Sequence, residues 1–80
     1  MILKVIDFIE LNIYEIKVNK RTILLDGTKI SSEIEYILFT SLDMEYKLNF
    51  YNIYENLVFS IPLNPNSVIM STKSSIKIKQ

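Results

Sequence analysis

Acidic side chains are the only groups of this chain whose type and spacing suggest acid–base or metal chemistry. Glu33 and Glu35 lie two residues apart in a segment that alternates like a strand, so their Cβ atoms would share one face roughly 7 Å apart. Two carboxylates at that distance can hold a divalent cation or act as a catalytic pair. Asp43 and Glu45 repeat the pattern. Because a solvated strand face has the same pattern, we favour that simpler interpretation for both pairs.

Glu55 differs from these pairs, because the hairpin register predicted below points it inward beside Leu48. A buried carboxylate needs a cationic partner. We therefore interpret Glu55 as paired with a lysine, or its register as mistaken, rather than as catalytic.

The composition removes most other catalytic chemistry. The chain has no His and no Cys, so it lacks the commonest metal ligands, the neutral-pH proton shuttle and the strongest nucleophile. Its serines have no histidine to activate them, and a single glycine, Gly27, cannot build a phosphate-binding glycine loop. We expect no enzymatic activity, no metal site and no cofactor.

Binding residues are better represented than catalytic ones. The second predicted hairpin gathers amide, phenol and ammonium groups at its tip and outer face, namely Lys47, Asn49, Tyr51, Asn52, Tyr54 and Asn56. Tyrosine and asparagine suit the recognition of a protein, a sugar or stacked bases. Tyrosine is also a good strand former, which explains the same residues without a ligand. A basic tail of Lys73, Lys77 and Lys79 could add phosphate contacts or protect an edge strand from aggregation.

Length and hydropathy predict one domain over residues 1–80 with apolar surface to spare. Hydrophobic residues make up 49% of the chain, more than one small core needs, and a homodimer interface or a partner surface would use the surplus. The absence of cysteine, of a signal peptide and of an uncharged apolar run near 18 residues favours an intracellular, cytoplasmic protein that does not enter the membrane.

Charge is balanced overall but arranged in blocks. Formal charges sum to −2 over residues 1–16, +3 over 17–29, −4 over 30–55 and +3 in the final stretch, for a net charge of zero. This balance predicts no strong electrostatic attraction to nucleic acid or to anionic lipid.

Asp26-Gly27 is the strongest local signal, because both residues suit a two-residue type I′ hairpin turn. It pairs Leu25 with Thr28 and predicts an alternating strand from Ile30 to Leu38. The incoming strand has its apolar residues at even positions before residue 19 and at odd positions after it. A one-residue bulge near Asn19-Lys20 would reconcile the two halves and place Ile16 opposite Tyr36.

A second hairpin is predicted around Tyr51-Asn52, with Ser41–Asp43 as the link from the first hairpin. Its register pairs Leu42 with Ile61 and Leu48 with Glu55. Pro62–Ser67 is predicted as a loop, followed by strands at 68–70 and 76–79, the last one an edge strand. The first eleven residues suit a strand or a short helix, with β-branching favouring the strand.

The predicted fold is all-β, an antiparallel meander of six to seven short strands closed as a barrel or folded as a sandwich, with an optional short N-terminal helix. The function that this pattern favours is a non-enzymatic interaction protein that binds a protein partner or itself, of the kind that viruses and mobile elements encode as inhibitors or assembly factors. The alternative is a small single-strand nucleic-acid-binding module using Tyr51, Tyr54 and Lys47.

Overall fold

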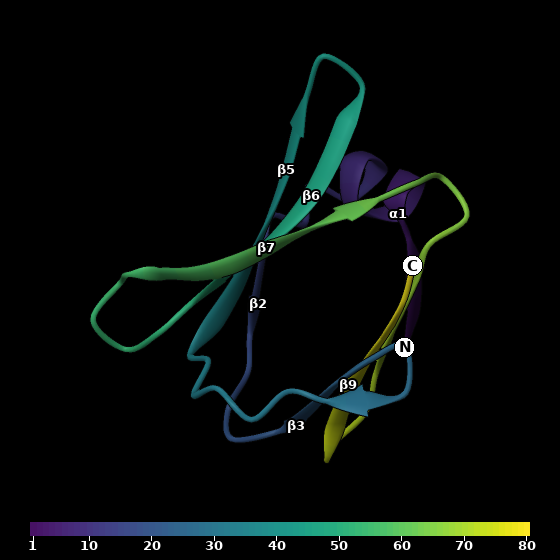
Figure 1. The fold of residues 1–80 in the computed structure, drawn as a ribbon. Coiled ribbons are helices and arrows are strands. Elements are labelled where there is room, and N and C mark those ends of the chain that lie inside the picture. Colours follow the sequence, from purple (N-terminus) through teal and green to yellow (C-terminus); the bar gives the residue numbers. More distant parts are fainter.

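The fold consists of nine short strands and one helix of six residues (Figure 1). A computed structural model describes all of residues 1–80. In chain order the elements are β1 (Ile2–Lys4), α1 (Val5–Glu10), β2 (Glu15–Lys17), β3 (Thr22–Leu25), β4 (Thr28–Lys29), β5 (Tyr36–Leu42), β6 (Glu45–Tyr51), β7 (Leu57–Leu63), β8 (Val68–Ser71) and β9 (Ser75–Lys79). The all-β prediction with a short N-terminal helix is confirmed. The structure contains no helix with the length and apolar character that a bilayer crossing requires.

The strands form two sheets that share one hydrophobic core. One sheet has five strands in the order β1-β8-β9-β3-β4, and the other has four in the order β2-β5-β6-β7. Neighbouring strands are antiparallel except for β3 and β9, which run parallel. Only β5, β6 and β7 form the predicted consecutive meander, so the fold is more interleaved along the chain than we expected.

The core is built by alternation within the strands of both sheets. In β9, Ile76 and Ile78 are buried while the lysines beside them are exposed. In β6, Leu48 and Phe50 are completely buried, and Phe50 stacks on Phe59 of β7 with ring centroids 4.4 Å apart. Burying such a side chain contributes about 1.5–3 kcal/mol, so these positions hold the two sheets together.

The amino terminus forms a strand and then a helix, both of the alternatives left open by its sequence. β1 pairs with β8 and buries Leu3, and the backbone N–H of Lys4 donates to Asp7 Oδ2 at 2.8 Å as the helix begins. Val5 and Phe8 are buried at helical spacing, and Phe8 stacks on Phe39 at 4.9 Å. The helix therefore closes one end of the core.

The Asp26-Gly27 turn is confirmed, but the strand after it is much shorter than predicted. Leu25 pairs with Thr28, and both turn residues have positive φ, 48° and 84°. β4 ends at Lys29, and residues 30–35 form no strand because the chain there crosses to the other sheet. The prediction of a continuous strand from Ile30 to Leu38 is therefore wrong.

The change of apolar parity near residue 19 marks a change of sheet, not a bulge. Asn19 and Lys20 both have positive φ and form a turn between β2 in one sheet and β3 in the other. β2 does pair with β5, as predicted, but one residue out of the expected register: Ile16 lies opposite Ile37 instead of Tyr36. The bulge prediction was wrong, but the change of apolar parity on which it was based does mark a change in the structure.

The hairpin between β5 and β6 was not predicted. Its two-residue turn is Asp43-Met44, with φ of 50° and 62°, and Leu42 pairs with Glu45. The sequence predicted Ser41–Asp43 only as a link between two hairpins. Methionine is not a turn residue, so a two-residue turn at Asp43-Met44 has no clear signal in the sequence.

The hairpin between β6 and β7 exists, but its loop and register differ from the prediction. The loop covers residues 52–56, and Leu48 lies opposite Ile61 instead of Glu55. Glu55 is exposed in the loop with φ of 63°, so its predicted inward position is wrong. Pro62, predicted as loop, lies in β7, where an edge strand tolerates its missing N–H.

The carboxyl-terminal strands lie where predicted, but the last one is not at an edge. β9 pairs with β8 on one side and with β3 on the other. The lysines of β9 are exposed because they point to the outer face of the sheet. The loop before β8 is fixed by Ser67, which is completely buried: its Oγ accepts from Asn64 N–H and donates to Gln80 O.

Candidate partner-binding cleft

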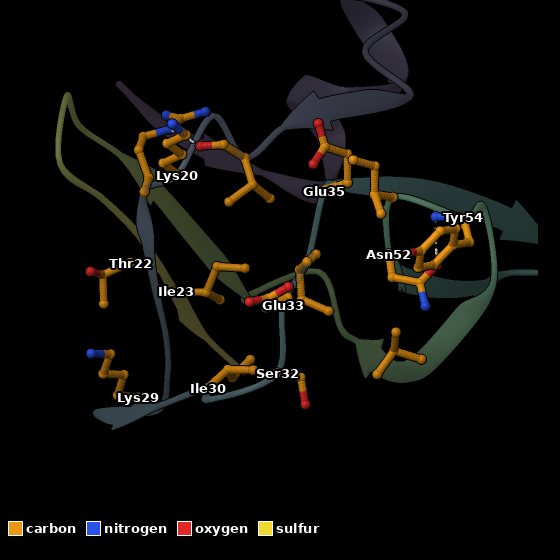
Figure 2. A pocket seen from close by; sticks show the side chains of 15 residues that line it. Lys20, Thr22, Ile23, Lys29, Ile30, Ser32, Glu33, Glu35, Asn52 and Tyr54 are labelled. Atoms are coloured by element: carbon orange, nitrogen blue, oxygen red, sulfur yellow. Dashed lines mark hydrogen bonds between the residues drawn. The ribbon is translucent and has the colours of Figure 1, made fainter.

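A cleft of about 760 Å³ opens where the crossing segment 30–35 passes between the two sheets (Figure 2). One wall is the β3–β4 side of the five-stranded sheet, and the opposite wall is the β6–β7 loop. The floor is apolar: Val18 and Ile23 are buried members of the core, and Ile30 and Ile34 pack against it. Figure 2 shows Ile23 and Ile30 turned toward the space and Thr22 and Lys29 turned away from it.

The two carboxylates singled out from the sequence line this cleft, although not on a strand. Glu33 and Glu35 are exposed in the crossing segment, and the backbone N–H of Glu35 donates to Tyr51 O at 2.8 Å. Lys20 and Arg21, which lie between β2 and β3, line the same cleft. The structure groups no three His, Cys, Asp or Glu side chains for a metal ion. Asp43 is in the β5–β6 turn and Glu45 at the start of β6, both exposed and away from the cleft.

Arg21 is the residue of this region that the sequence analysis missed. Its guanidinium donates to Val18 O at 2.9 Å and to Lys17 O, and it reaches across to Ser71 Oγ at 2.6 Å and Thr72 O at 3.1 Å. All of these acceptors are uncharged. Arg21 therefore ties the β2–β3 turn to the end of β8.

The β6–β7 loop presents apolar side chains at the lip of the cleft. Ile53 is 68% exposed and Tyr54 is 80% exposed, and both line the cleft. Leu57 and Val58 continue the exposed apolar surface at the start of β7, 55% and 40% exposed. We call these four side chains the loop ridge. Only Tyr54 among them was singled out from the sequence.

The loop is held by one asparagine. Asn52 Oδ1 accepts from the backbone N–H groups of Tyr54 at 3.0 Å and Asn56 at 3.1 Å. Backbone bonds from Asn52 N–H to Asn56 O and from Glu55 N–H to Asn52 O close the loop. Asn52 and Asn56 thus shape the ridge, which is a structural role beside the binding role predicted for them.

The other predicted binding residues lie on the outer face of the four-stranded sheet. Lys47 is exposed there, and Asn49 is occupied between strands: its amide donates to Leu38 O and Thr40 Oγ1 and accepts from Ser60 Oγ. Tyr51 stacks on Tyr36 of β5 with centroids 5.1 Å apart. The six predicted hairpin residues are therefore divided between this sheet face and the loop, and Tyr51 does not line the cleft with Tyr54.

Tyr36, which stacks on Tyr51, has a perturbed proton equilibrium. Burial raises the pKa of its hydroxyl above the usual 10.0, and the nearby charge of Glu55, then Tyr51 and Glu15, raises it further.

The basic tail lies on the other sheet. Lys73 is in the β8–β9 turn, and Lys77 and Lys79 are on the outer face of the five-stranded sheet. These lysines do not adjoin Lys47, so the structure does not bring the tail and the hairpin face into one surface. Comparison with protein-family models, curated proteins and solved structures finds no match to this chain.

Proposed function

We propose that this chain is a non-enzymatic interaction protein that binds protein partners, copies of itself among them. The observation that supports the proposal is the loop ridge, four exposed apolar side chains, of which Ile53, Tyr54 and Val58 line a cleft whose floor is apolar. Contiguous exposed apolar surface of this kind is typical of sites where proteins associate. The cleft offers a bound segment both an apolar floor and side chains of either charge at its rim.

Two features favour a peptide segment as the bound group. Tyr54 presents a large ring with few rotatable bonds, which is the composition of interface hot spots. The loop that presents it is fixed by the Asn52 hydrogen bonds, so little order has to be gained on binding. Burying one ridge side chain against a partner contributes about 1.5–3 kcal/mol.

The proposal is tested by selecting displayed random peptides on the purified protein and measuring their affinity by fluorescence anisotropy. We expect enriched peptides to bind the double variant Ile53→Ser/Leu57→Ser at least tenfold more weakly than the wild type. The matched control is Leu11→Ser, which removes a leucine 64% exposed beyond the end of α1 and should leave affinity unchanged. Circular dichroism checks that each variant is folded.

Two outcomes would overturn the proposal. One is the absence of any enriched peptide, and the other is equal loss of affinity in the ridge and control variants. Labelled single- and double-stranded oligonucleotides in the same assay test the nucleic-acid alternative. Salt-sensitive oligonucleotide binding that Tyr54→Ala weakens, without peptide binding, would replace the present proposal with that alternative.

A further inference from the structure

The strands of the five-stranded sheet carry charges of one sign only. They contain four lysines and no acidic residue, and all four lysines are exposed on the outer face of the sheet: Lys4, Lys29, Lys77 and Lys79. The register places Lys77 between Met70 and Leu24, and Lys79 beside Val68. Lysines and apolar residues therefore alternate across the sheet, a pattern hidden by the zero net charge of the chain.

This face is hollowed. A depression of about 580 Å³ is lined by Leu24, Val68 and Met70 together with the two lysines of β9. The only carboxylate at its margin is Asp26, whose Oδ1 accepts from Gln80 N–H at 2.9 Å. The hollow is thus an apolar recess with an ammonium rim. A ligand that fills it needs an apolar group and negative charge close together.

The tip of the β5–β6 hairpin has that chemistry. Met44 is 83% exposed and Leu42 is 73% exposed, the two carboxylates Asp43 and Glu45 alternate with them, and no lysine or arginine lies between residues 42 and 45. The tip projects from the four-stranded sheet (Figure 1). Tip and hollow therefore belong to different sheets.

We propose that the hairpin tip of one copy docks into the hollow of a second copy. Met44 fills the apolar recess, and Asp43 and Glu45 approach the ammonium groups of Lys77 and Lys79. The inference rests on the proposed function and specifies one of its partners. Because each copy offers one tip and one hollow, reciprocal docking of two copies closes a two-fold dimer, whereas a single contact between successive copies builds a ring or an open chain.

A second copy suits the hollow better than other anionic surfaces. A nucleic-acid backbone supplies charge without an apolar group, and the face has no aromatic ring on which bases could stack. A flat anionic bilayer meets the lysines but does not reach into a recess. The tip supplies both chemistries on a protruding turn.

Charge reversal tests the contact by sedimentation velocity over a range of protein concentrations. Wild-type protein should associate. Asp43→Lys/Glu45→Lys and Lys77→Glu/Lys79→Glu should each weaken association at least tenfold, because each puts like charges on its tip and hollow. An equimolar mixture of the two variants should associate again, since each tip then meets an opposite hollow. Lys17→Glu/Lys47→Glu, which reverses two exposed lysines of the other sheet, should behave as wild type.

Several results would overturn the inference. Wild-type protein that stays monomeric, or association unaffected by both reversals, contradicts docking of tip and hollow. Association lost only in Ile53→Ser/Leu57→Ser would assign self-contact to the loop ridge and leave the proposed function standing. Lysine-dependent binding to phosphatidylserine vesicles or to oligonucleotides by a monomer would assign the face to those ligands. Loss of peptide binding at the ridge is a separate result that contradicts only the proposed function.

Discussion

The two sheets of this protein are built in different ways from one chain. The four-stranded sheet takes three of its strands from one continuous meander, β5 to β7, and its strands contain two glutamates and two lysines. The five-stranded sheet collects short strands from both ends and the middle of the chain, and its strands contain lysine as their only charged residue. Strands that are distant in the sequence thus bring lysines together in one sheet. In the other sheet, lysine and glutamate balance each other.

The two sheets also present different kinds of surface. The four-stranded sheet supplies projecting hairpins, the tip and the loop ridge, whereas the five-stranded sheet supplies a recessed basic face. Both depend on one core, because the buried residues of the two sheets form a single cluster. A change in either sheet's core should therefore unfold both together.

The largest effect is expected from Phe50→Ala in the centre of the four-stranded sheet. Phe50 is completely buried against Phe59, so its truncation should cost about 3–5 kcal/mol, most of the stability of a domain of this size. Ile69→Ala, the matched change in the five-stranded sheet, should cost about 2–5 kcal/mol. Urea unfolding followed by far-ultraviolet dichroism and by tyrosine fluorescence should give one coincident transition. Two separate transitions would contradict a shared core.

Arg21→Met should cost about 1–3 kcal/mol, because it removes the donors that join the β2–β3 turn to Ser71 and Thr72 and leaves the Ser71 hydroxyl and the Thr72 carbonyl without this partner. Arg21→Lys keeps the charge but not the forked geometry, so it should recover less than half of that loss. Urea midpoints with unchanged slopes measure both. Full recovery by lysine would show that charge, not geometry, links the sheets here.

Substitutions in the two tight turns should change the stability of the protein in opposite directions. Met44 holds a side chain at φ of 62°, so Met44→Gly should raise stability by about 1 kcal/mol. Gly27→Ala in the β3–β4 turn should lower stability by about 1 kcal/mol through its backbone alone, because an added Cβ meets no atom within 4 Å. Thermal unfolding measures both changes. If Met44→Gly also weakens self-association, its side chain is retained for contact at the expense of stability.

The smallest effect concerns alkaline pH. The pKa of Tyr36 is raised in the folded protein, so below a pH of about 10 the phenol is neutral in both states, and above it the unfolded chain ionises first. Stability from this group is thus present below the unfolded pKa and lost as the pH rises through the folded pKa. Tyr36→Phe should lose less stability than wild type as the pH rises above about 10. Equal losses would contradict the raised pKa.

The sequence was informative where local chemistry decides structure. Asp26-Gly27 fixed its turn, and the alternation of isoleucine and lysine located β9, because both signals depend on adjacent residues. Asp43-Met44 gave no such signal, since its turn is imposed by the pairing of the flanking strands. Because this turn was not predicted, the predicted register of the next hairpin was wrong. The predicted positions of Glu55 and Leu57 were wrong for the same reason.

The basic face could not be predicted, because it depends on which distant strands meet. Lys4, Lys29 and Lys77 lie in three separate charge blocks of the sequence. Summing charge along the chain hides their shared face, and only the parallel pairing of β3 with β9 reveals it. The parity change at Asn19-Lys20 had the same cause: a strand that leaves one sheet for another looks like a bulge in sequence.

The most direct test of the docking of tip and hollow uses the absence of cysteine from this chain. Met44→Cys and Met70→Cys place one thiol on the tip and one in the hollow. Mixed in equal amounts and mildly oxidised, the two variants should form more of the mixed disulfide dimer than random pairing gives, and Lys77→Glu/Lys79→Glu in the hollow variant should abolish that excess. A statistical mixture of dimers, or a preference for homodimers, would contradict the account.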